Sequence, residues 1–163
     1  MKVALVNPPW TFDGSIYFGC REPHLPLEYG YAKALLERAG HEAAIVDAQA
    51  DGTSLAGVRA AVDALRPDMI VVTTAPSYLF WRCAPPELRV PRATLDAVRD
   101  AGALLVAVGP HASSTPETTL AKLDVHVAVL GECEEVLVRL ASGSRAMWPM
   151  IPSIAYVDGD APR

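Results

Sequence analysis

Short apolar runs alternate with amphipathic segments along the whole chain. Each run ends at proline, glycine or a polar residue, which is typical of parallel strands buried on both faces. The runs cover residues 2–6, 43–46, 69–72, 104–108 and 125–130. Between them, apolar residues recur at helical spacing. This strict alternation predicts an α/β fold with right-handed crossovers and helices on both faces of the sheet.

The number of strands and the chain length favour one sheet topology. We expect a flavodoxin-like, doubly wound and mostly parallel five-stranded sheet with the order 2-1-3-4-5. In such a sheet the ligand crevice lies at the carboxyl ends of the first and third strands. The site is therefore expected in the loops that follow the strands.

Helix boundaries follow from periodicity and from breakers. Leu27, Tyr31, Ala34 and Leu35 share one face of a helix that is expected to bury this face and to end near Gly40. The other predicted helices cover 55–65 and 91–101, and two more begin at 114–117 and 131–135.

Composition and charge exclude several classes of protein. The chain has 163 residues, of which 51% are hydrophobic and 20% charged, so we expect one globular domain rather than a disordered chain. The net charge of −5, without a basic cluster, argues against nucleic acid or an anionic membrane as partner. No apolar run is long enough to span a membrane, and the amino terminus does not resemble a signal peptide.

The three cysteines are widely separated. Cys20, Cys83 and Cys133 form none of the short spacings used by zinc, iron–sulfur or dithiol sites. Reduced thiols and a cytoplasmic location are the expectation.

The carboxyl-terminal residues predict an incomplete hairpin. Residues 153–157 are typical of a strand and Asp158-Gly159 of a tight turn, but too few residues follow for a returning strand. A frayed terminus and an excised or split domain both remain open.

Two loops have a composition suited to a large ligand. The connection from Asn7 to Pro26 is long and holds Trp10, Phe12, Tyr17 and Phe18, which could cover a flat apolar ligand or pack back onto the domain. The loop over residues 73–83 combines hydroxyl groups with three aromatic side chains. Gly109, after the fourth strand, either admits a close neighbour or simply ends the strand.

The first loop is unsuited to phosphate. Asn7-Pro8-Pro9-Trp10 contains two residues without an amide N–H, whereas a phosphate cradle needs successive N–H groups. No acidic cluster follows the first strand either. Flavin-type phosphate sites and phosphate-receiver sites are therefore disfavoured.

Five motifs at the strand ends point to one family. They are V-N-P-P-W, L-P-L-E-Y-G-Y, T-x-x-P-S, V-G-P-H-A-S-S-T-P-E and L-G-E-C-E-E, in that order between Lys2 and Asp158. Together they resemble the amino-terminal cobalamin-binding domain of cobalamin-dependent radical SAM enzymes of the methyltransferase type. The resemblance implies a sheet edge that binds the corrin ring and a nucleotide tail that threads between strands.

The resemblance also implies binding residues. Gly109 would let the tail pass close to the backbone, and Ser77 would hydrogen-bond to it. The matched positions are Pro8, Pro9, Trp10, Thr74, Ser77, Tyr78, Gly109, Pro110, His111, Gly131, Glu132 and Glu134.

Cobalt coordination is expected to lack a histidine. The D-x-H-x-x-G motif of other cobalamin proteins is missing, since His24 has Glu22 before it and Leu27 after it. We expect base-off cobalamin, present as methylcobalamin or hydroxocobalamin, with its lower face covered by Tyr78, Trp81 or Arg82. His41 and His126, beside predicted strands, are interpreted as structural.

The radical chemistry is expected elsewhere. The sequence has no C-x-x-x-C-x-x-C motif for an iron–sulfur cluster, so the cluster and S-adenosylmethionine would belong to a partner or to a missing domain. Residues 1–147 are predicted to bind cobalamin and 148–163 to lead toward a radical SAM domain, with methyl transfer to an unactivated carbon as the joint reaction. A free-standing cobalamin carrier or sensor, and a flavodoxin-like domain with another cofactor, remain alternatives.

Overall fold

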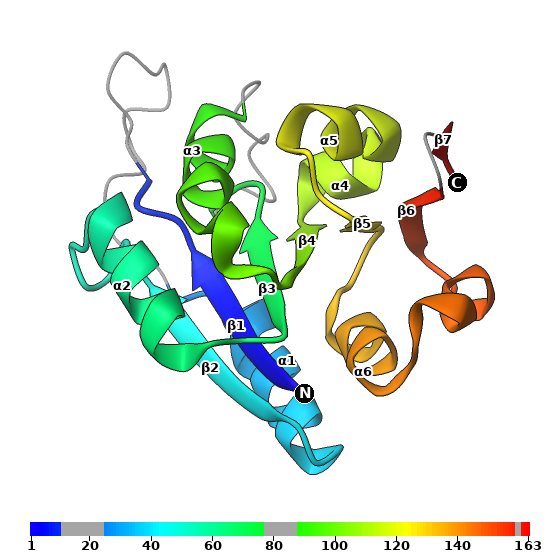
Figure 1. Cartoon of the computed structure of the whole chain (residues 1–163), viewed down its shortest axis with the longest axis horizontal. Coiled ribbons are helices and arrows are strands. Elements are labelled where there is room, and N and C mark those ends of the chain that lie inside the picture. The colour runs from blue at the N-terminus through cyan, green and yellow to red at the C-terminus, as the bar shows by residue number, and fades with distance from the viewer. Residues whose placement is uncertain (11–24, 77–87, 159–160) are drawn as a thin grey trace.

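The computed structural model describes residues 1–10, 25–76, 88–158 and 161–163. Within these ranges seven strands form one sheet with the order β2-β1-β3-β4-β5-β6-β7 (Figure 1). The first five are parallel and have the predicted order: β1 (Lys2–Asn7), β2 (Glu42–Asp47), β3 (Met69–Thr73), β4 (Leu104–Val108) and β5 (Val127–Val129). The predicted fold class is confirmed, and two antiparallel strands, β6 (Ile154–Asp158) and β7 (Ala161–Pro162), extend it.

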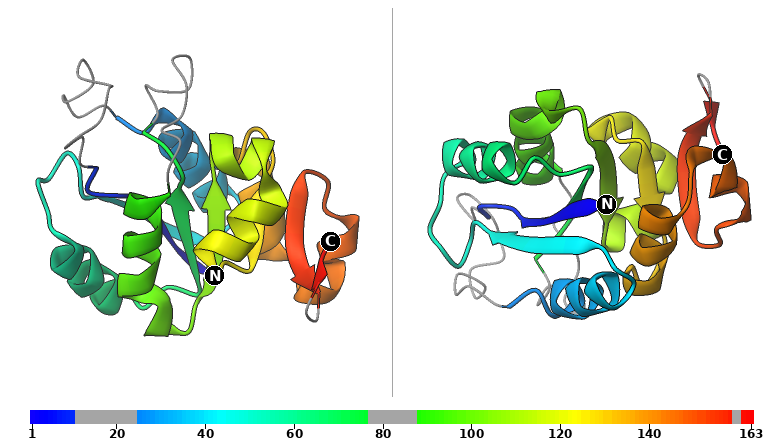
Figure 2. Two further views of the ribbon diagram at one scale, coloured as in Figure 1. Left: turned by 90° about the horizontal axis from the view of Figure 1, so that it is seen from above. Right: turned by 60° about the horizontal axis from the view of Figure 1, so that its bottom comes forward.

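Helices cover both faces of the sheet, as Figure 2 shows. On one face lie α1 (Leu27–Arg38) and α6 (Glu134–Ser142), followed by the 3-10 helix η3 (Arg145–Met150). On the other lie α2 (Leu55–Leu65), α3 (Arg89–Val98) with the 3-10 turn η2 (Arg99–Ala101), α4 (Pro110–Ser114) and α5 (Pro116–Leu123). None of the helices in the described ranges is both long and apolar enough to cross a bilayer.

Alternate residues of each parallel strand enter two separate cores. Val3 and Leu5 of β1 pack with α1 and α6, whereas Ala4 and Val6 pack with the helices of the other face. All four of these side chains are fully buried. This two-sided burial explains why the strands are visible in the sequence as uninterrupted apolar runs.

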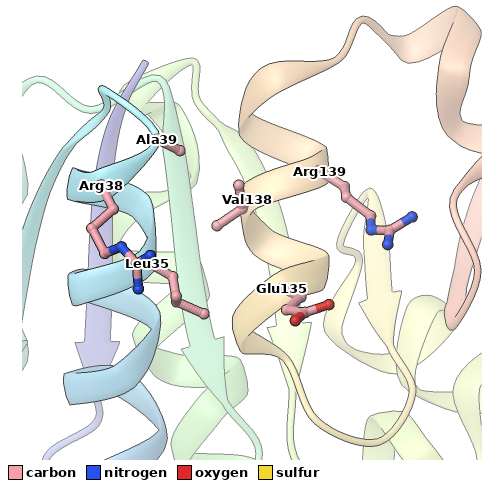
Figure 3. Close-up of a pocket in the computed structure, with 6 residues that line it drawn as sticks. All are labelled: Leu35, Arg38, Ala39, Glu135, Val138 and Arg139. Carbon is pink, nitrogen blue, oxygen red and sulfur yellow. The ribbon is translucent and has the colours of Figure 1, made fainter.

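The buried face of α1 differs from the prediction. Leu27 and Tyr31 are 64% and 67% exposed, while Tyr29, Ala32 and Leu36 lie in the core. Leu35, on the outward side, faces Val138 of α6 across a surface groove of about 370 Å³ (Figure 3). The helix has apolar residues on two stripes, and the stripe that includes Tyr29 is buried because its hydroxyl can reach the backbone of the sheet.

Tyr29 joins α1 to the two central strands. Its hydroxyl lies 3.1 Å from the Val6 carbonyl oxygen and 3.4 Å from that of Val71. Burial, followed by electrostatic interactions with Cys133 and Glu28, raises its pKa well above the ordinary value. A buried hydroxyl placed between two carbonyl oxygens is stable only in its protonated form.

The segment after β4 is helical rather than a loop. Gly109 precedes the five-residue helix α4, with Pro110 in its first turn, where a missing N–H costs nothing. The next helix, α5, begins at Pro116, within the predicted 114–117, and Thr115 precedes it without a side-chain capping hydrogen bond. The Thr115 hydroxyl instead donates to the His111 carbonyl oxygen of α4, at 3.2 Å.

The carboxyl-terminal hairpin closes further than predicted. Val157 pairs with Pro162, and Tyr156 and Arg163 exchange two backbone hydrogen bonds of 2.8 and 3.1 Å. The expectation of too few residues for a returning strand is therefore wrong, since two suffice. Trp148, at the start of the predicted linker, packs into the same core as α1 and α6.

Replacing Tyr29 with phenylalanine tests the link between α1 and the sheet. Tyr29→Phe removes a buried hydroxyl, so we expect a loss of about 1 kcal/mol in the free energy of unfolding. Because the folded pKa is raised, the hydroxyl's contribution is complete below about pH 10 and is lost as the pH rises further. Urea unfolding between neutral pH and pH 11 should show a steeper alkaline loss in the wild type than in the variant.

The matched control is Tyr31→Phe on the same helix. Tyr31 is exposed, so removal of its hydroxyl should leave both stability and its pH dependence unchanged. Equal behaviour of the two variants would contradict the role assigned to Tyr29.

Candidate functional site

The carboxyl ends of the parallel strands bring the predicted binding residues to one edge of the sheet. Asn7 pairs with Asp47, and Thr73 with Val108, at the last positions of their strands. The residues predicted after β1, β3, β4 and β5 follow directly: Pro8, Pro9, Trp10, Thr74, Gly109, Pro110, His111, Gly131, Glu132 and Glu134. Four predicted residues, Ser77, Tyr78, Trp81 and Arg82, and also His24, lie outside the described residues.

Asn7 anchors the turn after β1. Trp10 donates through its indole Nε1 to the Asn7 Oδ1 at 2.8 Å, and the Asn7 Nδ2 donates to the Asp47 Oδ1 at 2.8 Å. Asn7 is only 3% exposed, so these hydrogen bonds are shielded from water. The indole of Trp10 is thus fixed to the ends of two strands. Sequence reasoning missed Asn7, although a polar residue ending an otherwise apolar strand was a usable signal.

The same turn offers no amide to an anion. Pro8 and Pro9 have no N–H, and the Trp10 N–H donates to the Pro8 carbonyl oxygen at 2.9 Å. The prediction that this turn cannot cradle a phosphate therefore agrees with its hydrogen bonding.

Glycine is required at position 109 because neighbouring protein atoms leave no room for a side chain. Its φ of 103° lies in the region that favours glycine, and a Cβ there would lie 3.0 Å from the Thr74 Oγ1 and 3.2 Å from the Thr73 Oγ1. The close neighbour is thus the turn after β3. That turn also accepts a hydrogen bond from the His111 N–H at the Thr74 Oγ1, at 3.3 Å. A larger residue at 109 would displace both turns whatever ligand is bound.

A small cavity of about 80 Å³ opens between the ends of β3, β4 and β5. Ser113 closes one side, because its Oγ donates to the Gly109 carbonyl oxygen at 3.0 Å and accepts from the Gly131 N–H at 2.9 Å. The volume suits one small group of a ligand, such as an amide arm, rather than a whole ring system. Its lining comprises Glu28, Thr73, Val108, Gly109, Ser113, Gly131, Glu132 and Cys133.

Half of this lining was not predicted. The predicted half comprises Thr73, Gly109, Gly131 and Glu132, and the other half comprises Glu28, Val108, Ser113 and Cys133. Each residue of the second half lies within one of the five motifs, so the segments that form the cavity were visible in the sequence. Helix α4 decides which of these side chains point into the cavity, and the sequence pattern did not predict this helix.

The cavity wall is acidic and holds a protonated thiol. Burial, and then the charges of Glu134 and Glu28, raise the pKa of Cys133 to about 12. A thiol with this pKa is a poor nucleophile at neutral pH, because little thiolate is present. In the described part of the chain no group of three or more His, Cys, Asp or Glu side chains could hold a metal ion.

Together these features suit an uncharged ligand that forms hydrogen bonds. Pro9 and Trp10, which are half-buried, supply apolar surface, whereas Pro8 is buried. The hydroxyl of Ser113 and the Glu132 carboxylate supply polar groups, and anions are disfavoured. Primary amides, which donate to carboxylates and hydroxyls, match this set.

Alkylation tests the state of Cys133. In a Cys20→Ser/Cys83→Ser background, the folded protein should react with iodoacetamide at pH 8 at least about 100-fold more slowly than in urea, because the raised pKa leaves little thiolate. The rate should still be rising above pH 9.5. Mass spectrometry of timed samples gives both rates, and rapid labelling of the folded protein would contradict the assignment.

The chain is similar to one protein family and to several solved structures. The B12 binding domain family matches residues 21–141. No curated protein sequence matches the chain.

Solved structures share the fold at low sequence identity. The radical S-adenosylmethionine methyltransferase TsrM from Kitasatospora setae, with tryptophan and a SAM analogue bound, has a TM-score of 0.77 at 19% identity, over 99% of this chain and 29% of that one. TsrM with cobalamin and a [4Fe-4S] cluster bound has a TM-score of 0.76 at 20% identity, over 99% and 30%. The cobalamin-dependent radical enzyme OxsB, with aqua-cobalamin and S-adenosylmethionine bound, has a TM-score of 0.70 at 16% identity, over 99% and 21%.

The chain therefore spans less than a third of the length of these enzymes. Both the predicted resemblance and cobalamin as the cofactor of this fold are confirmed by the family match. Since that match covers most of the sequence, the chain belongs to the B12-binding domain family.

Proposed function

We propose that the chain binds cobalamin along the carboxyl edge of β1, β3 and β4 and presents it to a radical SAM domain for methyl transfer. The observation that carries the proposal is the anchored Trp10 turn, which has no free amide and lies at the carboxyl ends of β1 and β2. A corrin ring is large and flat and carries primary amide arms, so it matches an apolar wall beside polar side chains. When bound, cobalamin supplies a methyl group held on cobalt.

The residues of this chain position the cofactor. Trp10, fixed through Asn7, and the prolines before it would support the ring, while Thr74, His111 and Pro110 would border the path of the nucleotide tail. Gly131, Glu132 and Glu134 would receive amide arms near the cavity. Gly109 permits the tight contact between the two turns that shapes this path.

Cobalt is proposed to have no histidine ligand from this chain. His41 and His126 are held at the opposite edge of the sheet, where His41 contacts Ser142 at 2.9 Å and His126 accepts a hydrogen bond from the Leu105 N–H. The lower face of the corrin is proposed to be covered by Tyr78, Trp81 or Arg82. His24 is proposed to have no part in coordination.

The remaining chemistry is assigned to another domain. The relatives of this fold are larger enzymes, and the iron–sulfur cluster and S-adenosylmethionine of the present system are proposed to lie on a radical SAM domain or protein. Residues 1–147 are proposed as the cobalamin unit, and 148–163 as the connection toward that partner.

Retention of hydroxocobalamin tests the binding site. The protein should keep the coloured cofactor after desalting, and Trp10→Ala should weaken binding at least about tenfold, since a large apolar contact is lost. Asn7→Leu keeps the indole but removes its anchor, so we expect a smaller loss together with a red-shifted tryptophan emission.

Met150→Ala serves as the control, because Met150 is 74% exposed and is not one of the proposed binding residues. Its affinity should equal that of the wild type. A wild-type protein that emerges colourless would contradict the proposal.

The cobalt spectrum tests the coordination. His24→Ala should leave the visible spectrum of the bound cofactor unchanged, because no histidine of this chain is proposed to bind cobalt. A shift of the main absorption bands in this variant, with retention of the cofactor, would identify His24 as a ligand and contradict the proposal.

A further inference from the structure

A second cavity, of about 400 Å³, lies at the edge of the sheet opposite to the cobalamin edge. It is formed where β4 and β5 begin and where β6 ends, and Leu105, His126 and Val157 line it. Its volume falls in the range of small-molecule sites, which is roughly 300–1,000 Å³. No residue of this cavity takes part in the proposed function.

His126 presents a fixed hydrogen-bond donor to this cavity. The Leu105 N–H donates to the His126 Nδ1 at 2.9 Å, so the neutral ring carries its proton on Nε2. Burial and the nearby charge of Arg145 lower the pKa of His126, although Asp124 acts in the opposite direction. The ring therefore offers its Nε2–H, with its orientation set by the backbone of β4.

Arg145 presents an unmatched positive charge. One of its guanidinium nitrogens donates to the Val157 carbonyl oxygen at 2.8 Å, and the group lies over the Trp148 ring, 5.1 Å from the ring centre. These contacts hold the guanidinium in place and leave most of its N–H groups available. Among the described residues no carboxylate pairs with it.

The other arginine of the cavity is already neutralised. Arg99 forms ion pairs with Asp124 at 2.9 Å and with Asp96 at 3.2 Å, and donates to the Leu123 carbonyl oxygen at 2.9 Å. Arg99 and Asp124 therefore compensate each other, and Arg145 is the one charge of the described lining that has no ionic partner. The rest of its lining is largely apolar, with Ala103, Leu105 and Val125.

We propose that this cavity binds a monocarboxylate with a small apolar body, held by the Arg145 guanidinium and the His126 Nε2–H. The planar fork of arginine matches the two oxygens of a carboxylate. Both donors are held by other contacts, so binding orders few groups. A dianion such as phosphate is disfavoured, because one uncompensated guanidinium balances only a single negative charge. The carboxylate is either a free acid or an aspartate or glutamate side chain of another polypeptide.

Nuclear magnetic resonance of the labelled protein tests the site. At pH 7.5 and constant ionic strength, hexanoate should give saturable shifts of the His126 Nε2 and Leu105 amide signals, with weaker binding for acetate and for inorganic phosphate. Arg145→Gln should weaken hexanoate binding at least fivefold, and Arg145→Lys, which keeps the charge but not the fork, should weaken it less.

Arg38→Gln is the matched control, because Arg38 is an exposed arginine on α1 outside this cavity. It should bind hexanoate as the wild type does, and well-dispersed spectra should verify that every variant is folded. Non-saturable shifts, or equal affinity in wild type and Arg145→Gln, would overturn the site. Phosphate binding more tightly than hexanoate would overturn its assignment to a monocarboxylate.

A capped peptide with one glutamate among alanine and valine distinguishes the two sources. If the peptide binds more tightly than hexanoate, the ligand is a carboxylate side chain of another polypeptide. If the peptide binds more weakly, the ligand is a free acid. Because the cavity is remote from the cobalamin edge, hydroxocobalamin retention in Arg145→Gln should equal that of the wild type. Failure of one proposal is therefore distinguishable from failure of the other.

Discussion

The burial of the neighbouring strands β1 and β3 determines where the rest of the molecule lies. Every residue of β3, and Val3 to Asn7 of β1, is buried, so their backbone groups have to pair within the sheet. This pairing fixes the register of β1 with β2 and β3 and makes the strands end together. The loops that follow them then meet at one edge, and the ligand site is a consequence of that common end.

The edge is braced by hydrogen bonds between its turns. Asn7 links Trp10 to the end of β2, Thr74 receives the His111 amide, and Ser113 joins α4 to the turn after β5. Such bracing reduces the conformational entropy lost when a ligand binds. It also means that the glycine between the turns is a structural requirement, so loss of cofactor after its replacement would not by itself identify a contact to the cofactor.

The strands and their order could be predicted because burial on both faces leaves an unambiguous pattern in the sequence. The buried face of α1 could not be predicted, because the helix has two apolar stripes. The buried stripe carries Tyr29, whose hydroxyl bonds to two strands that are distant in the sequence. The location of the site followed from the fold, whereas Asn7 and Ser113 were missed because their roles arise from contacts between loops. Helix α4 was missed because five residues are too few for a periodic pattern.

The raised pKa of Cys133 bears on how the protein withstands oxidation. Burial raises this pKa to about 12, so little thiolate is present at neutral pH. Peroxide attacks the thiolate and needs access to it, and Cys133 is only 4% exposed. The cavity wall should therefore keep its shape in an oxidising solution, whereas an exposed thiol at this position would be modified.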